Sequence, residues 1–420
     1  MNSYIKKWPT LLLLVLLCAV LSGTAGCRSG GKSAFAEPAD YVDPLLVQAN
    51  TAFALDLFHA LREEAPGENI FISPASISLT LAMTYNGAAG ETAAAMEKVL
   101  KLEEMSLEEV NEACADLRTI LQNPDPKVEL AIANSLWARL GVDFYEDFMQ
   151  RNSDYYGAEI ASLDFDLPDA AATINKWVEQ QTKGKIQDLI EPPIDSNTVL
   201  FLLNAIYFQG DWSKPFDAER TREVPFHLPD GSSKEHPVMF REGEFPYLDG
   251  DGFQAVALPY GKNERISMYI FLPDSGETPQ SFYGKLAPAQ WDSWMASFRD
   301  TEGAVGVPRF KFAYEASLNE VLKKLGMEIA FDDRAADFSS MRPTPPRLYI
   351  GKVKHKAFVE VHEKGTEAAA ATSVEIKQES APMDWFSMTV DRPFFFSIID
   401  NKTGSILFMG SVTDPLPGSN

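Results

Sequence analysis

The sequence predicts a single mixed α/β domain that spans about residues 40 to 415. Helical amphipathic patterns alternate with apolar runs typical of strands, and beyond residue 40 no low-complexity block or linker divides the chain. No repeat recurs at a fixed period. The 420 residues are 45% hydrophobic and 11% aromatic, which is enough to bury a large core.

Residues 1–26 are predicted to form a signal peptide. Lys6 and Lys7 precede an apolar run, residues 11–21, that is too short to span a bilayer comfortably. The stretch L-S-G-T-A-G-C that ends at Cys27 resembles the lipobox of bacterial lipoproteins, although its threonine stands where an aliphatic residue is usual. Lipidation of Cys27 would make residues 27–40 a lipid anchor and flexible tether. Ordinary signal cleavage is the alternative.

The cysteine count fits this anchor. Cys18 leaves with the signal peptide, so Cys114 remains alone in the mature domain and no internal disulfide forms. The net charge of −23 argues against a nucleic-acid binder and against a polybasic membrane patch. We therefore expect an exported protein that meets a membrane only through its lipid anchor. It is either a cell-surface or periplasm-facing lipoprotein or, without the anchor, a secreted protein.

Helix and strand signals are strongest in the middle of the chain and near its end. Residues 171–184 place four side chains at helical spacing: Ile174, Trp177, Val178 and Gln181. Gly184 is placed to end this helix. Residues 198–208, T-V-L-F-L-L-N-A-I-Y-F, form a continuous apolar run typical of a strand buried on both faces. Residues 266–273 and 392–399 have the same character.

Two motifs look catalytic but lack the context that their chemistry needs. Residues 26–33, G-C-R-S-G-G-K-S, match a phosphate-binding P-loop, which requires a strand before it and a helix after it; this match straddles the predicted cleavage site. The K-T-G at residues 402–404 occurs in penicillin-recognising enzymes, but the nucleophilic S-x-x-K appears only at Ser3 and Ser29. The five histidines show no metal-ligand spacing. We expect no enzyme, no cofactor and no metal site.

Residues 363–380, E-K-G-T-E-A-A-A-A-T-S-V-E-I-K-Q-E-S, alternate cleanly when they are laid out as a strand. One face carries small or apolar residues: Thr366, Ala368, Ala370, Thr372, Val374 and Ile376. The other face suits solvent: Glu367, Ala369, Ala371, Ser373, Glu375 and Lys377. Alanine and serine are poor strand formers, so local propensity does not commit the segment to a strand.

The residues just before this segment read as a strand that leads into it. They place four residues on one face: His355, Ala357, Val359 and Val361. The segment itself can be an exposed loop whose alternation is accidental. We favour a loop that later enters a sheet, because small side chains can slide between two existing strands without steric conflict.

Four separated motifs identify a family. They are N-I-F-I-S-P-A-S-I at residues 69–77, N-A-I-Y-F-Q-G-D-W at 204–212, K-L-G-M-E-I-A-F-D-D-R-A-A-D-F-S at 324–339, and D-R-P-F-F-F-S-I-I-D-N-K-T-G-S-I-L-F-M-G at 391–410. In this order, over nearly the whole mature chain, they resemble the serpins, which are serine protease inhibitors of the suicide type. Ser411 departs from the basic residue often found there. The resemblance implies a single domain, residues 41–420, with about three β-sheets and eight to nine helices. It also implies an exposed reactive-centre loop at about residues 363–385.

The resemblance also assigns residues to two places in the main sheet. The shutter is a hydrogen-bond cluster beneath the sheet where strands part: Ser73, Ser76, Asn204 and His355. Each of these four can equally be a satisfied polar group of the core. The breach, where the loop first enters the sheet, comprises three residues: Trp212, and Glu363 paired with Arg309.

The implied mechanism depends on the loop hinge. A serine protease attacks the loop and forms an acyl-enzyme; the loop then inserts into the sheet, carries the protease to the far pole and stalls deacylation. The hinge enters first: Gly365, Thr366, Glu367, Ala368, Ala369, Ala370, Ala371 and Thr372. Its uncharged threonine and small alanines favour an active inhibitor. The alternative is a non-inhibitory binding or storage protein whose loop is only a substrate.

Family spacing from the breach places the scissile bond between Glu379 and Ser380. Glutamate before the bond predicts a glutamate-preferring serine protease. A trypsin-like cut after Lys377, an elastase-like cut after Ile376 and a cysteine protease as target are alternatives. The stretch after the bond is longer than in many family members, so the register can shift. We expect a monomer whose partner is the target protease.

Overall fold

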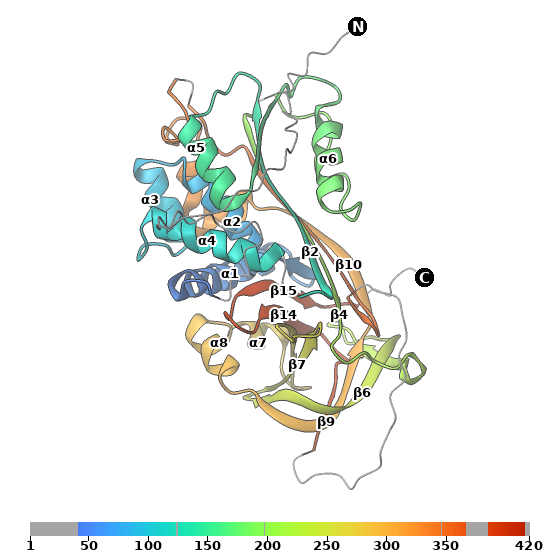
Figure 1. The fold of residues 1–420 in the computed structure, drawn as a ribbon. Coiled ribbons are helices and arrows are strands. Elements are labelled where there is room, and N and C mark those ends of the chain that lie inside the picture. Colours follow the sequence, from blue (N-terminus) through green and yellow to red (C-terminus); the bar gives the residue numbers. More distant parts are fainter. Residues whose placement is uncertain (1–40, 123–124, 197, 346, 367–384, 416–420) are drawn as a thin grey trace, which may run out of the picture. The chain divides into compact units, whose positions relative to one another are not determined.

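The computed structural model describes residues 41–122, 125–196, 198–345, 347–366 and 385–415 (Figure 1). All of them belong to one compact unit, Pro38–Asn420. The predicted lipidation site, Cys27, lies outside the described residues. Within the described part, no helix is long and apolar enough to cross a membrane.

Nine α-helices occur in the part of the chain that the structure describes, in agreement with the expected eight to nine. They are α1 Pro44–Glu64, α2 Pro74–Tyr85, α3 Gly90–Val99, α4 Leu107–Gln122, α5 Glu146–Arg151, α6 Ala170–Gln181, α7 Pro279–Tyr283, α8 Pro288–Met295 and α9 Asn319–Leu322. The start of α2 shows why the sequence begins a helix there. Ser73 caps it by accepting a hydrogen bond from the Ser76 amide at 3.3 Å, and Pro74 follows at the first helical position.

Six strands form the main sheet, in the order β10-β11-β4-β2-β3, with β12 also paired to β4. Their bounds are β2 Val128–Arg139, β3 Glu159–Leu163, β4 Leu200–Asp211, β10 Phe310–Ser317, β11 Lys352–Val361 and β12 Gly365–Thr366. The strand β4 is the predicted apolar run, and ten of its twelve residues are buried. Alternation in β11 buries the face predicted from the sequence, which includes His355 and Val359.

Nine further strands form a second hydrogen-bonded network, in the order β1-β15-β14-β8-β7-β6-β9-β13 with β5 on β6. Their bounds are β1 Ile70–Ile72, β5 Arg222–His227, β6 Ser233–Gly250, β7 Phe253–Tyr260, β8 Ile266–Pro273, β9 Arg299–Pro308, β13 Phe386–Thr389, β14 Phe394–Asp400 and β15 Ile406–Val412. The long strand β6 pairs with β5 and β9 along most of its length, and with β7 only from Tyr247 to Gly250. This short junction joins two sheets into one network, which reconciles it with the expected three sheets.

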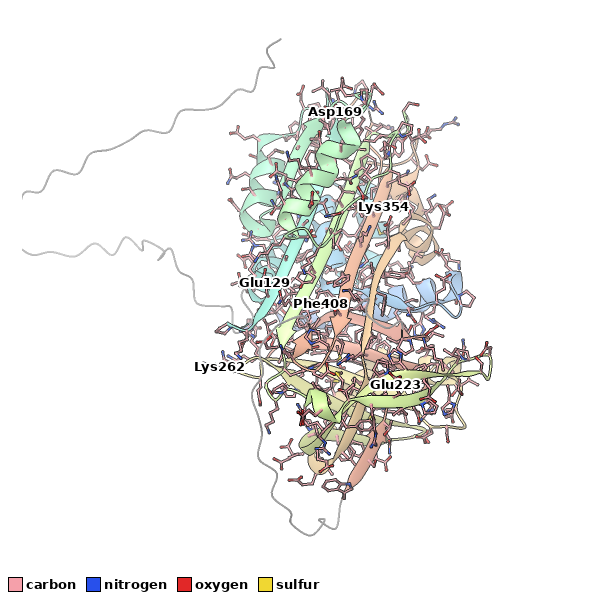
Figure 2. The ribbon with its side chains drawn as sticks, turned by 90° about the vertical axis from the view of Figure 1, so that its right-hand side faces the viewer. Glu129, Asp169, Glu223, Lys262, Lys354 and Phe408 are labelled. Atoms are coloured by element: carbon pink, nitrogen blue, oxygen red, sulfur yellow. The ribbon has the colours of Figure 1, made fainter. Side chains whose placement is uncertain are left out.

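The helices cover the main sheet on both faces (Figures 1 and 2). The larger core contains side chains from α1, α2 and α4 and from the inner faces of β2, β4 and β11. A smaller core lies under α6, where Ile174 and Val178 pack against the outer face of β2 and β4. Gln181, predicted on the same helical face, is exposed, because the helix ends there and Thr182 turns inward instead. Any strand that enters between β4 and β11 therefore joins a sheet whose inner face is already packed.

Candidate functional site

A tight turn at the end of β11 starts the candidate site. The backbone amides and carbonyls of His362 and Gly365 exchange two hydrogen bonds, at 2.9 and 3.1 Å. Glu363 and Lys364 are thus the two central residues of a hairpin turn. This turn reverses the chain, so that β12 runs back along the sheet beside β11.

The strand β12 occupies a gap between β4 and β11. Gly365 pairs with Asp211 and Thr366 with Gly210, both antiparallel, while Gly210 pairs with Val128 of β2 on its other edge. The direct pairing of β4 with β11 extends only as far as Tyr207 opposite Phe358. The strands β4 and β11 are therefore paired directly as far as Tyr207 and Phe358. Beyond these residues they are separated, and the first residues of the hinge lie between them.

Glycine is required at the first hinge position. The φ angle of Gly365 is +149°, which L side chains rarely adopt, and a Cβ atom there would lie 2.0 Å from the carbonyl oxygen of Gly210. A Cβ on Gly210 would in turn lie 2.9 Å from the ring of Tyr260. These two glycines allow β12 to approach β4 closely.

The second hinge residue is fully buried. Thr366 has no exposed surface, and its hydroxyl lies 3.0 Å from the hydroxyl of Tyr260. The sequence predicted Thr366 on the inward face of a strand, and its side chain does point inward. The structure differs from a loop held wholly outside the sheet, because Gly365 and Thr366 are already paired within it.

Trp212 holds the turn that precedes the hinge. Its backbone amide donates to the carbonyl of Lys364 and its indole Nε1 to the carbonyl of His362, both at 2.9 Å. The amide of Phe216 donates to the carbonyl of Glu363 at 2.7 Å. The chain after β4 thus binds three consecutive carbonyls of the turn, and the breach is a firm anchor for the loop.

The structure places Glu363 against Arg309, as the resemblance implied. Arg309 donates from Nε at 2.8 Å and also from Nη2 to the same oxygen of Glu363, and the hydroxyl of Thr221 donates to that oxygen at 2.5 Å. Burial works to raise the pKa of Glu363, but the bonds from Arg309 and Thr221 outweigh it, and the pKa is lowered. The carboxylate is therefore charged at neutral pH.

The four predicted shutter residues meet in one hydrogen-bond cluster at the level where β4 and β11 are still paired. His355 and Asn204 lie opposite each other, and Nδ1 of His355 donates to Oδ1 of Asn204 at 2.5 Å. The amide of Asn204 donates to the hydroxyl of Ser76 at 2.6 Å. The hydroxyl of Ser73 donates to the carbonyl of Leu407 at 2.7 Å, which ties the cluster to β15.

His355 is neutral within this cluster. It is fully buried, and this desolvation lowers its pKa to about 3, against a smaller opposing contribution from the Phe71 backbone. An amide oxygen only accepts, so Nδ1 carries the imidazole proton that Asn204 receives. The shutter is thus an uncharged cluster at any physiological pH.

Sequence reasoning missed several members of both clusters. Asn134 of β2 lies opposite Asn204 and accepts its amide at 2.7 Å, and Thr80 of α2 lies within 3.2 Å of the same amide. Asn134 was detectable, because it is the one polar residue on a face of β2 whose other residues are all apolar: Val128, Leu130, Ile132, Leu136 and Ala138. Tyr260 and Thr221 carry no such signal, since each reaches the hinge or its turn from a distant part of the chain.

Much of the predicted loop lies outside the described residues: Glu367, Ala368, Ala369, Ala370, Ala371, Thr372, Ile376, Lys377, Glu379 and Ser380. The chain is described again from Trp385, and β13 follows as a parallel partner of β9. The ring of Phe386 stacks on that of Tyr247, with centroids 3.9 Å apart, and this contact fixes the start of β13. Among the described residues, no group of three or more His, Cys, Asp or Glu side chains can hold a metal ion.

The arrangement defines a class of protein before any comparison is made. One of its sheets carries the first two residues of a loop as an added strand, between two long strands that are still paired further along. Such a sheet can accept more of the same loop by continuing the ladder. This arrangement is typical of proteins whose main sheet can take in a further strand.

Comparison with known proteins gives the family. Residues 48–415 match the family model for Serpin (serine protease inhibitor). The chain is 38% identical over 381 residues to the leukocyte elastase inhibitor of Homo sapiens, covering 88% of this chain and 99% of that protein. The chain belongs to the serpin family of serine protease inhibitors.

Two solved structures illustrate the range of the fold. The thermophilic serpin tengpin in its native state has a TM-score of 0.82 and 33% identity, with 89% of this chain and 95% of that chain covered. Human thyroxine-binding globulin, complexed with thyroxine, has a TM-score of 0.81 and 28% identity, with 89% and 99% covered. The serpin fold expected from the sequence is confirmed.

Proposed function

We propose that this chain traps its target protease after a cut between Glu379 and Ser380. The protease serine attacks the Glu379 carbonyl, the bond to Ser380 breaks, and an acyl-enzyme ester forms. The freed segment then continues the strand that begins at Gly365, and the tethered protease is displaced before water can hydrolyse the ester. One observation carries this proposal: β12 is already seated between β4 and β11.

The pairing of β12 supports this position for the bond. Thr366 lies opposite Gly210, so an antiparallel continuation would bring Ile376 opposite Leu200, the first residue of β4. A cut after Glu379 would let the whole of β4 be paired and leave three residues as a tether. Roughly ten new rungs, at about 0.5–1.5 kcal/mol for each hydrogen bond, would release on the order of 10 kcal/mol.

The residue before the bond indicates the kind of target. Glutamate there fits a serine protease whose pocket offers basic or hydrogen-bonding groups. Cuts after Lys377 or Ile376 would suit trypsin-like or elastase-like enzymes, but they would shorten or remove the tether. The leukocyte elastase inhibitors among the relatives favour the elastase-like alternative. A cysteine protease is the remaining target class.

We also propose that the protein works outside the cytoplasm as a monomer without enzymatic activity of its own. The basic start, the apolar run and the lipobox-like stretch before Cys27 support export and lipid anchoring. A diacylated cysteine would hold the protein at a cell-surface or periplasm-facing membrane. Without lipidation the same signal would lead to secretion.

A second candidate function is that of a binding protein with the serpin fold. The structural likeness to thyroxine-binding globulin favours it, because that protein's solved structure contains thyroxine. Such a protein would be cleaved in its loop without retaining the protease. The two candidates therefore differ in one measurable product.

The test is to mix the protein with a glutamate-specific serine protease and to examine the products by denaturing gels and mass spectrometry. The proposal expects a covalent species whose mass is the sum of both proteins less the peptide that starts at Ser380. Trypsin and pancreatic elastase, tested in parallel, report on Lys377 and Ile376. Cleavage at all three positions without a covalent species would contradict inhibition and favour the binding protein.

A further inference from the structure

The contact between Tyr260 and Thr366 joins the two sheets at the hinge. Tyr260 is the last residue of β7 in the nine-stranded network, whereas Thr366 is in the main sheet. Their hydroxyls lie 3.0 Å apart, and neither residue has exposed surface. Figure 2 labels Lys262, two residues beyond Tyr260, near the junction of the sheets.

The ring of Tyr260 is fixed, so its hydroxyl can point only at the hinge. It stacks on Trp212 with ring centroids 4.2 Å apart, and it forms a T-shaped contact with Phe208 with centroids 5.0 Å apart. Gly210 lies so close that a Cβ there would be 2.9 Å from the Tyr260 ring. The backbone around Tyr260 is held too, because the amide of Gly261 donates to the carbonyl of Asp211 at 2.8 Å.

This hydrogen bond forms only when the hinge is seated. A hinge outside the sheet would leave the Thr366 hydroxyl in water and the buried Tyr260 hydroxyl without this partner. A buried hydroxyl that loses its partner is destabilised, so Tyr260 favours the seated hinge over the released one. Gly365 permits this state, because its positive φ and missing side chain allow the close approach to Gly210.

We propose that Tyr260 is a positioning residue for loop insertion, whose hydroxyl keeps Gly365 and Thr366 in the sheet as the first rungs of the inserting strand. This inference rests on the proposed inhibitory function. Parting β4 from β11 and forming the first rungs must otherwise happen after the acyl-enzyme has formed, in competition with deacylation. A hinge that is already seated removes that step, and the cleaved loop continues an existing ladder.

The test compares Tyr260→Phe with Tyr269→Phe. Both variants lose one tyrosine hydroxyl, but Tyr269 lies on β8 and donates at 3.0 Å to Asn401, far along the chain from the hinge. Two quantities are measured: amide hydrogen exchange of the peptide that contains Gly365 and Thr366, without protease, and the ratio of covalent complex to cleaved inhibitor. The protease is the one that gives the covalent species with the unmodified protein.

The expected result is faster exchange at the hinge in Tyr260→Phe and a roughly fivefold lower ratio of complex to cleaved product, the factor that one net hydrogen bond corresponds to. The rate of loop cleavage should not fall, and Tyr269→Phe should match the unmodified protein in both measurements. Thr366→Val, which lacks the partner hydroxyl, should reproduce the effect, and the double variant should add little more.

Three outcomes would overturn the proposal or separate it from the function on which it rests. Unchanged hinge exchange in both Tyr260→Phe and Thr366→Val would show that the hydroxyl pair does not hold the hinge. Faster exchange with an unchanged product ratio would show that the seated hinge plays no part in trapping. If the unmodified protein forms no covalent species with any protease, the proposed function fails, and faster exchange in both variants would still support Tyr260 as the residue that seats the hinge.

Discussion

The shutter and the breach lie on the same pair of strands, but they are built from different interactions. At the shutter, β4 and β11 pair directly, and a neutral, fully buried cluster joins Asn204 to His355. At the breach the two strands are separated by the hinge, and the contacts are a charged pair, Glu363 with Arg309, and an aromatic stack. One end of the sheet is closed and the other has begun to open.

This difference shows how one sheet can be stable and yet accept a strand. Neutral hydrogen bonds in a buried cluster are costly to leave unmade, so the shutter resists separation until a new strand supplies replacements. At the breach, Gly365 and Thr366 already pair with β4 in place of β11. In the proposed mechanism, insertion would therefore have a direction: it would start at Thr366 and pass Asn204.

The largest expected effect comes from placing a charged side chain at the breach, the end of the sheet where β4 and β11 are separated. Thr366→Arg would put a guanidinium against Tyr260, in a position without exposed surface, so the hinge should leave the sheet. We expect a folded protein that is still cleaved in its loop but forms essentially no covalent complex, as judged on denaturing gels. Thr366→Ser, which keeps the hydroxyl, should retain trapping. Unchanged complex formation by the arginine variant would refute insertion through this gap.

The next largest effect tests the closed end. Asn204→Ala would leave Nδ1 of His355 without its partner and would remove the bonds that the Asn204 amide donates to Ser76 and Asn134. We expect the free energy of unfolding in urea to fall by about 2–4 kcal/mol, since several buried groups lose hydrogen bonds together. Thr80→Val removes a longer contact of 3.2 Å to the same amide and should cost about 1 kcal/mol. Equal losses in both variants would mean that Asn204 does not organise the cluster.

The two regions also differ in how far the sequence could predict them. Alternation in β11 put His355 on one face of its strand, and the apolar run predicted the strand that carries Asn204. Only the family motifs assigned the two residues to one cluster. The seated hinge was not predictable, because a strand of two residues shows no pattern of its own and its pairing depends on Gly210 and Tyr260. Such contacts depend on how the two sheets meet, and local patterns do not specify that.

A third prediction uses pH to separate the neutral shutter from the charged breach. His355 has a pKa of about 3 in the fold, whereas an unfolded histidine titrates near 6.5. Between these values the unfolded chain takes up a proton that the folded protein refuses. Stability should therefore decrease as pH falls from 6.5 toward 3, by up to about 1.4 kcal/mol per pH unit for this group.

His355→Gln checks the source of that slope. The amide of glutamine can donate to Asn204 but does not titrate, so urea unfolding of this variant should depend less on pH between 4.5 and 6.5. His227→Gln serves as the control, because His227 is exposed and lies outside both clusters. An unaltered slope in His355→Gln would show that the shutter histidine is not the group that resists protonation.

The smallest expected effect is at the ion pair of the breach. Glu363→Gln keeps one oxygen acceptor, which can replace the single oxygen that Arg309 and Thr221 both contact, but removes the charge. Because the Arg309 side chain is 39% exposed, solvent screens the pair, and we expect a loss of at most about 1 kcal/mol in urea unfolding that shrinks with added salt. The more exposed pair of Glu320 with Lys323 provides the control: Glu320→Gln should change stability by a few tenths of a kcal/mol at most. A loss in Glu363→Gln as large as that of Asn204→Ala, and insensitive to salt, would erase the contrast between a screened, charged breach and a buried, neutral shutter.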